Sequence, residues 1–119
     1  MVFQVLVVDP SPVARAALAE LVRAAGDGID VAELVSPAGR GGGTVGLDPN
    51  LIILTESTPE TIAATRTAYP PAEIVVLGLA DDARYERRAL EAGADRYLPR
   101  ERAPDELSGL VREVAGLYS

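Results

Sequence analysis

LIILTESTPE, residues 51–60, joins an apolar run to the start of a helix, and this junction decides the fold class. Residues 51–55 are expected to form a strand that is apolar on both faces, as is typical of a parallel strand covered by helices on both sides. The Thr-Pro-Glu sequence that follows predicts a helix that extends to about residue 68. A strand that leads directly into a helix, with Thr55 at its tip, indicates an α/β domain.

The rest of the chain repeats this alternation of strand and helix. Apolar, β-branched runs predict further strands at residues 3–8, 29–35, 72–79 and 95–99. Caps and apolar periodicity predict helices from Ser11 to Gly26, from Asp81 or Asp82 to Gly93, and from Pro104 to Leu117. The apolar face of the first helix is expected to comprise Val13, Ala17, Leu18, Leu21, Val22 and Ala25.

Five strands that alternate with helices predict a parallel sheet with helices on both faces. The chain has 119 residues, so we expect one domain over residues 1–119 and the flavodoxin-like strand order 2-1-3-4-5. The last strand contains Pro99, which favours a sheet edge. Glycine and proline are dense after the second strand, so the second helix is expected to be weak or replaced by a glycine-rich loop.

Composition excludes several classes of function. The net charge is −7 and the pI is about 4.5, so we expect neither nucleic acid nor an anionic membrane as a partner of this domain. The chain has no cysteine and no histidine, which excludes thiolate or imidazole metal sites and Ser-His or Cys-His catalysis. The N-terminal segment has no basic region before its apolar run, so we expect a cytoplasmic protein. No nucleophile and base can be paired in this sequence, so we do not expect an enzyme.

Four blocks of the sequence resemble a bacterial response-regulator receiver domain. They are VLVVDPSPVARAAL, DPNLIILTESTP, IVVLGLADD and ALEAGADRYLPRERAPDEL, which together cover nearly the whole chain. The last block is the most specific and is most similar to receivers that precede a helix-turn-helix output domain. The resemblance implies a CheY-like fold and a role in two-component signal transduction, phosphorelay or transcription regulation. Whether an output domain follows in the full-length protein stays open.

The functional positions of that family are altered in this chain. Two acids end the family's first strand and hold magnesium, and the matching residues are Asp9 and Pro10. The family's phosphoacceptor aspartate corresponds to Thr55, its small hydroxyl residue on the fourth strand to Gly78, and its lysine on the fifth to Arg100. The resemblance therefore implies a pseudo-receiver with a degenerate phosphorylation cleft.

Phosphoryl transfer needs an anionic nucleophile and a divalent ion that neutralises the charge on the transferring phosphoryl group. A threonine hydroxyl without a base is a poor nucleophile, and a single carboxylate at Asp9 is only a weak magnesium ligand. We therefore expect no catalytic residue, no cofactor and no metal. Glu56 directly follows Thr55 and is either a substitute acid or a solvated loop carboxylate, since side chains alternate along a strand.

Each remaining residue of the cleft has two interpretations. Asp9 is either a relic ligand or an acceptor of backbone N–H groups at the start of the first helix. Thr55 either caps the end of a buried strand or is phosphorylated by a separate kinase. Arg100 either pairs with Asp9 across the strand tips or is an exposed charge of little energetic value.

An interaction face is predicted around the fifth strand and the helices that flank it, with the first and last helices as another possible dimer face. Its candidate residues are Tyr85, Arg87, Arg88, Tyr97, Arg100 and Arg102. Mixed charge around aromatic residues suits a moderate, specific interface with a protein partner or effector domain, or a homodimer. Tyr97 also matches the family's aromatic switch position, which has lost its hydroxyl partner at Gly78.

Two alternatives to phosphorylation-independent binding remain. A ligand-gated domain would bind a small metabolite in the vacant cleft, in a pocket bounded by Pro10, Thr55 and Gly78. A residual phospho-receiver would use Glu56. The glycine-rich residues 41–46 fit G-x-G-x-x-G, but they follow the second strand rather than the first, so we expect a loop and no dinucleotide site.

Overall fold

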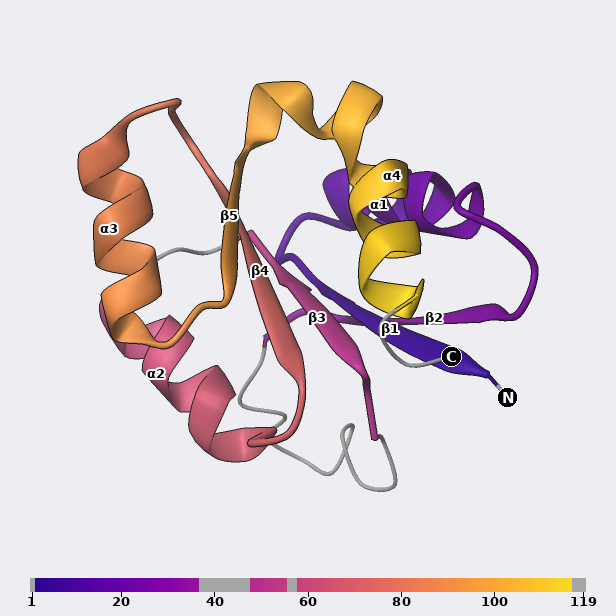
Figure 1. The fold of residues 1–119 in the computed structure, drawn as a ribbon, viewed down its shortest axis with the longest axis horizontal. Helices are drawn as coiled ribbons and strands as arrows, with labels where there is room; N and C mark the ends of the chain where they lie inside the picture. The colour runs from indigo at the N-terminus through magenta and orange to yellow at the C-terminus, as the bar shows by residue number, and fades with distance from the viewer. Residues whose placement is uncertain (1, 37–47, 56–57, 117–119) are drawn as a thin grey trace.

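The computed structural model describes residues 2–36, 48–55 and 58–116. These residues contain one sheet of five strands in the order β2-β1-β3-β4-β5, in which every neighbouring pair is parallel (Figure 1). The strands are β1 (Phe3–Val8), β2 (Ile29–Leu34), β3 (Leu51–Leu54), β4 (Glu73–Gly78) and β5 (Arg96–Pro99). The predicted flavodoxin-like order is confirmed, and β5 lies at a sheet edge as its proline predicts.

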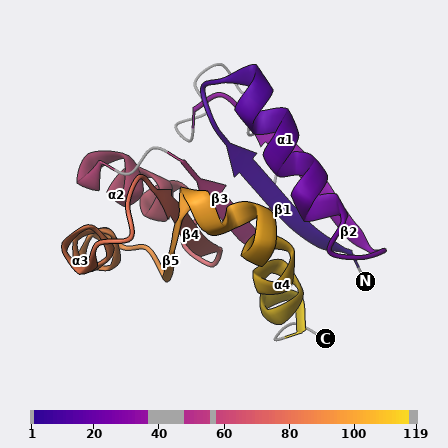
Figure 2. The same cartoon turned by 90° about the horizontal axis from the view of Figure 1, so that it is seen from above.

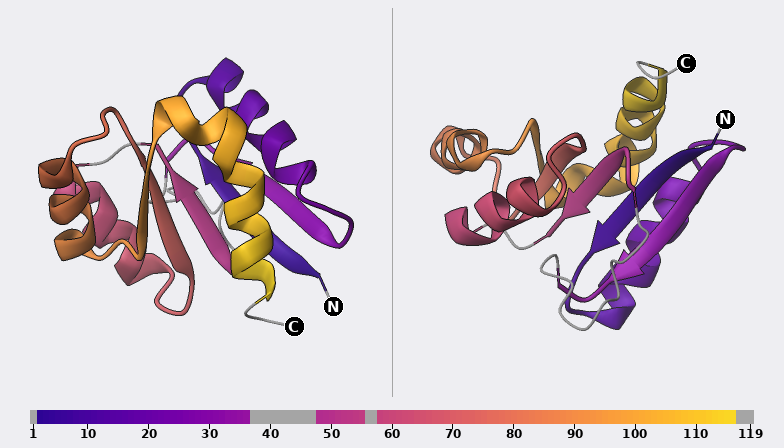
Figure 3. Two further views of the ribbon diagram at one scale, coloured as in Figure 1. Left: turned by 45° about the horizontal axis from the view of Figure 1, so that its top comes forward. Right: turned by 90° about the horizontal axis from the view of Figure 1, so that it is seen from below.

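In the described part of the chain, four α-helices cover this sheet in pairs, two on each face (Figure 2). They are α1 (Pro12–Arg23), α2 (Pro59–Ala68), α3 (Ala83–Ala92) and α4 (Ala103–Gly116), and a 3₁₀ turn (Arg100–Arg102) precedes α4. Helices α1 and α4 contact each other over one face, and α2 and α3 contact each other over the opposite face (Figure 3).

The two faces of the sheet hold separate apolar cores because side chains alternate along each strand. Val5 and Val7 of β1 pack with α1 and α4, whereas Leu6 and Val8 pack in the core that includes α2 and α3. Residues 5–8 of β1 and all of β3 are buried on both faces of the sheet, which explains why these stretches are continuously apolar rather than alternating.

The helix starts match the predicted caps. Ser11 Oγ accepts a hydrogen bond from the Ala14 amide at 3.3 Å, and Asp82 Oδ1 accepts one from the Arg84 amide at 2.8 Å. These side chains satisfy amides that have no partner within the helix. The helix α3 ends at Gly93, whose φ of 125° is a conformation that glycine adopts most readily.

The predicted apolar face of α1 is partly wrong. Val13 is 81% exposed and Ala17 is exposed, whereas Ala19 is buried together with Leu18 and Val22. At about 100° per residue, Val13 lies roughly half a turn around the helix axis from Val22, so the two cannot face the same core. The helix also ends three residues before the predicted Gly26, at Arg23, with Ala24 as its C-cap.

Some predictions fall on residues that the structure does not describe. The weak helix or glycine-rich loop after β2 and the glycine sequence at 41–46 lie largely or wholly within residues 37–47. Glu56 and Leu117 also lie outside the described residues. Within the described part, no helix is both long and apolar enough to cross a membrane.

Candidate functional site

The carboxyl ends of the parallel strands meet at one edge of the sheet, where Asp9 follows β1 and Thr55 follows β3. Asp9 is buried, with 5% of its surface exposed, and its Oδ1 accepts a hydrogen bond from the Ser11 amide at 2.8 Å. Its backbone carbonyl accepts a bond from Arg15 Nη1 at 2.9 Å. These contacts favour the interpretation of Asp9 as a residue that orders the turn into α1. Pro10, next to it, is exposed.

Thr55 is also buried, and its polar groups are directed at the neighbouring strand. Its Oγ1 donates to the Val8 carbonyl at 3.2 Å, and its amide donates to the same oxygen at 3.3 Å. The hydroxyl therefore adds a second hydrogen bond to the last carbonyl of β1, as expected of a residue that caps the polar end of a buried strand. This bond uses the only hydrogen that the side chain can donate.

Arg100 approaches Thr55 from the other side of the cleft. Its Nη2 donates to the Thr55 carbonyl at 2.9 Å, and among the described residues it forms no ion pair with Asp9, which corrects that alternative. The reason is geometric, because β1 and β5 are three strand spacings apart, or about 14 Å. Arg100 can reach the end of β3 but not that of β1.

The described residues do not fit a magnesium site. They contain no group of three acidic side chains that could hold a metal ion, and proline at position 10 offers no side-chain ligand. Thr55 has its hydroxyl bonded to a backbone carbonyl, so Asp9 is left as a single carboxylate that also holds the turn. Magnesium prefers several oxygen ligands in octahedral geometry, which these residues do not provide.

Gly78 and Tyr97 form a close contact between β4 and β5. The strand register pairs Tyr97 with Val76, so Gly78, two residues later on β4, lies on the same face of the sheet. A Cβ atom at Gly78 would lie 1.9 Å from the Tyr97 hydroxyl oxygen and 2.1–2.2 Å from two ring atoms. The tyrosine therefore occupies the space that any larger residue at 78 would need.

In this position, Tyr97 holds the loop between β4 and α3 in place through a hydrogen bond. The Tyr97 hydroxyl donates to the Ala80 carbonyl at 2.7 Å, and burial raises the pKa of the phenol above its usual value of 10.0. The next residue of the loop, Asp81, accepts a bond from Arg102 Nη2 at 2.6 Å. Arg102 also lies 3.8 Å from Glu106, so its ion pairs join the loop after β4 to the start of α4.

A groove of about 420 Å³ opens above the ends of β3, β4 and β5, between the start of α2 and the side of α3. Its described lining comprises Thr55, Thr58, Pro59, Leu79, Tyr85, Arg88, Tyr97 and Arg100. Residues predicted for the cleft and residues predicted for the interaction face thus line one surface. Pro10 and Gly78, two of the three residues expected to bound a ligand pocket, are not among them.

Sequence reasoning missed the groove residues that come from the loop and from α2. Leu79 was expected to end the fourth strand, but β4 ends at Gly78 and Leu79 is 79% exposed. Thr58 and Pro59 were noted only as a helix start, which they are. The available signal was that this helix start follows the strand that carries Thr55, which places both at the same sheet edge.

Comparisons with known proteins agree on the fold. No protein-family model matches the sequence, and no curated protein matches it significantly. Among solved structures, a response regulator from Thermotoga maritima has a TM-score of 0.80 at 20% identity, over 98% of this chain and 99% of that chain. A putative pilus assembly protein from Burkholderia thailandensis has a TM-score of 0.80 at 21% identity, over 96% of this chain and 98% of that one.

A third structure, a CheY-like response-regulator receiver domain protein from Methanospirillum hungatei, has a TM-score of 0.69 at 15% identity, over 98% of this chain and 99% of that chain. These structures match nearly the whole chain, which has the five-stranded parallel order of the CheY-like fold. The chain therefore has the fold of response-regulator receiver domains.

Proposed function

We propose that this receiver-fold domain acts in signal transduction by phosphorylation-independent contact with a protein partner or effector domain, or by homodimerisation. It is not an enzyme in this proposal, because no described nucleophile is paired with a base. A response regulator and a putative pilus assembly protein share the fold at the same TM-score, so we do not restrict the proposed partner to a DNA-binding output domain.

One observation carries the proposal: polar groups at the strand ends are bonded to backbone atoms rather than directed together at a reaction centre. The Thr55 hydroxyl donates to the Val8 carbonyl, and Arg100 donates to the Thr55 carbonyl. Asp9 accepts from the amide of Ser11. A reactive receiver needs a free anionic nucleophile and a divalent ion at this place, and the described groups supply neither.

The two alternatives have weaker support. A small metabolite usually needs a site that encloses most of its surface, whereas the groove has Leu79 and Tyr85 standing 79% and 47% exposed on its walls. A residual phospho-receiver depends on Glu56, which lies outside the described residues.

Chemical phosphorylation tests the proposal directly. The purified protein is incubated with acetyl phosphate and Mg²⁺, and its intact mass is measured, with a typical receiver domain as the positive control. We expect no phosphoryl adduct on this chain. An adduct on the wild type that disappears in Glu56→Gln would refute the proposal and establish the residual phospho-receiver instead.

Association is measured in the same samples by sedimentation over a range of protein concentrations. We expect the measured mass to be unchanged by Mg²⁺ and by beryllofluoride, because the described strand ends do not fit the metal or its phosphoryl mimic. A mass that increases only when both reagents are present would contradict phosphorylation-independent binding.

A further inference from the structure

Two arginines that line the groove have no acidic partner in the described part of the chain. Six described arginines form ion pairs, at positions 15, 23, 66, 84, 96 and 102, and of the four that form none, Arg88 and Arg100 line the groove whereas Arg87 and Arg112 lie outside its lining. Unpaired arginines are unexpected at this place because the chain carries 18 acidic and only 11 basic residues. The groove is therefore a locally positive feature on an acidic protein.

The groove also presents apolar surface beside these charges. Leu79 is 79% exposed and Tyr85 is 47% exposed, and both line it. Exposed apolar side chains next to unpaired arginines are typical of protein interfaces, where tyrosine and arginine are enriched. A small ligand would leave these walls in water, whereas a protein segment would cover both the walls and the rim.

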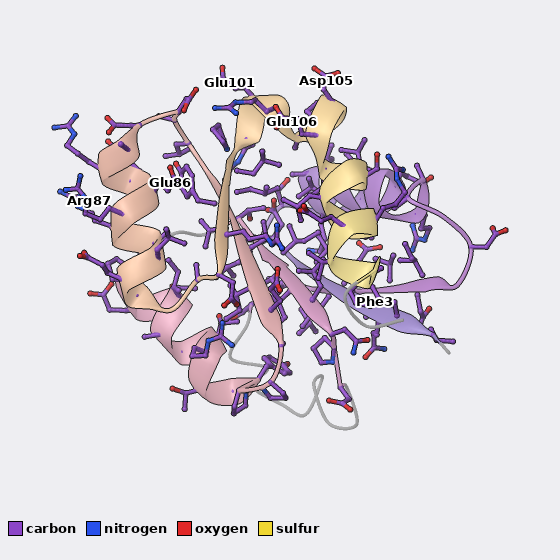
Figure 4. The ribbon with its side chains drawn as sticks, in the orientation of Figure 1. Phe3, Glu86, Arg87, Glu101, Asp105 and Glu106 are labelled. Atoms are coloured by element: carbon purple, nitrogen blue, oxygen red, sulfur yellow. The ribbon has the colours of Figure 1, made fainter. Side chains whose placement is uncertain are left out.

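Among the described residues, no nearby acid forms an ion pair with the groove arginines. Asp82 is bonded to Arg84, which lowers the pKa of the carboxyl group below 3.8 through these hydrogen bonds, with a smaller contribution from the charge of Arg88. Glu86 lies on the side of α3 that faces β5, whereas Arg87 points away from the body of the domain (Figure 4). Glu86 is outside the groove lining, but its charge acts on Tyr97, which lines the groove, so Glu86 is one described acid that would oppose a negatively charged partner.

We propose that the groove binds an acidic segment of a protein partner that inserts one apolar or aromatic side chain against Leu79 and Tyr85. The carboxylates of this segment would pair with Arg88 and Arg100, both of which can offer two parallel N–H donors to a carboxylate. This inference rests on the proposed function and assigns its binding surface. It places the partner above the strand ends, between α2 and α3.

Selection from a random peptide library displayed on phage tests the chemistry of the partner without assuming its identity. We expect the selected peptides to be enriched in Asp or Glu together with an aromatic or large aliphatic residue. Synthetic copies of these peptides are then titrated by fluorescence polarisation, and their affinity should fall as salt is raised. A selection without acidic enrichment would overturn the proposal.

Matched variants test the place of binding. We expect Arg88→Glu with Arg100→Glu to weaken the selected peptides by about tenfold or more, and Leu79→Ser to weaken them as well. Outside the groove lining, Arg87→Glu reverses one arginine charge and Leu90→Ser replaces one exposed leucine, and each should leave the affinity unchanged. Circular dichroism of each variant verifies folding, and equal losses in groove and control variants would refute the assignment.

One reciprocal variant tests the sign of the electrostatic effect. Glu86→Gln removes the opposing charge and should tighten binding of the same acidic peptides, with little effect on folding because Glu86 is exposed. This gain cannot be produced by a variant that merely unfolds. Unchanged or weaker binding would show that the peptides do not lie beside α3, and would overturn the proposed position.

The other possible occupants give distinct results. A wild-type dimer that dissociates in the Arg88→Glu and Arg100→Glu variant, but not in Arg87→Glu, would identify a second copy of the chain and overturn the partner proposal. Displacement of the selected peptides by equimolar inorganic phosphate or benzoate would identify a small-anion site instead. Neither result requires a phosphoryl adduct, so this proposal can fail while the proposed function stands.

Discussion

Gly78→Ala adds one methyl group at the point where β4 meets Tyr97, and its effect on stability can be worked out from the contact. The new Cβ would lie 1.9 Å from the hydroxyl oxygen and 2.1–2.2 Å from two ring atoms of Tyr97, far inside van der Waals contact. The ring therefore has to leave its place. With it would go the 2.7 Å hydrogen bond to the Ala80 carbonyl that holds the β4–α3 loop.

The sign of the effect distinguishes this contact from an ordinary glycine in a strand. Gly78 has no positive φ, so alanine would fit its backbone, and without a clash the substitution should stabilise the protein by about 0.4–1 kcal/mol. The clash reverses this expectation. Overpacking costs about 1–3 kcal/mol and the lost hydrogen bond about 1 kcal/mol, so we expect a net destabilisation of about 2 kcal/mol.

Urea denaturation followed by circular dichroism measures the free energy of unfolding for the wild type, Gly78→Ala, Tyr97→Ala and the double variant. Removal of the ring removes the clash, so Gly78→Ala should be neutral or stabilising in the Tyr97→Ala background. The coupling energy in this cycle should be about 2 kcal/mol. Stabilisation by Gly78→Ala alone, or a coupling energy near zero, would show that Tyr97 does not occupy the space above residue 78.

Two further predictions concern other polar contacts. Arg66 donates hydrogen bonds to the carbonyls of residues 70, 72 and 93 and to the carboxylate of residue 95, so Arg66→Lys should lower the free energy of unfolding by about 2 kcal/mol in urea denaturation. The exposed control Arg112→Lys should stay within about 0.5 kcal/mol of the wild type. Burial raises the pKa of Tyr97 above 10.0, so the unfolded chain ionises first and stability should fall as pH rises from 10.0 through the folded pKa. Tyr97→Phe should remove that part of the decline in alkaline denaturation experiments, and an unchanged decline would contradict it.

The sheet could be predicted because its signals are local. Continuously apolar runs identify buried parallel strands, and Ser11, Thr58 and Asp82 begin their helices with side-chain caps that can be recognised from sequence. The face of α1 was predicted less well because Val13 and Ala17 are apolar yet exposed. Apolar residues on a surface are common, so composition alone does not fix the rotation of a helix.

The candidate site was harder to predict because its contacts join separate strands. Sequence reasoning placed Thr55, Gly78 and Arg100 at strand ends, but the bond from Arg100 to the Thr55 carbonyl depends on side-chain reach across the sheet. The Gly78–Tyr97 contact depends on the register of β4 against β5, which no single segment specifies. The resemblance therefore indicated which positions to compare, whereas the structure shows what Thr55, Gly78 and Arg100 contact.

The contact between Gly78 and Tyr97 also links stability to the groove. The bonds from Tyr97 to Ala80 and from Arg102 to Asp81 hold the two loop residues that follow Leu79, which itself stands exposed on the groove wall. A change that displaces Tyr97 should therefore disturb both the folded state and the apolar wall. A change at Arg88 should affect binding alone, because among the described residues this side chain has neither an ion pair nor a hydrogen bond to lose, whereas Arg100 also bonds to the Thr55 carbonyl. Glycine at position 78 thus has a physical role as the residue that lets tyrosine serve as a structural support for the loop.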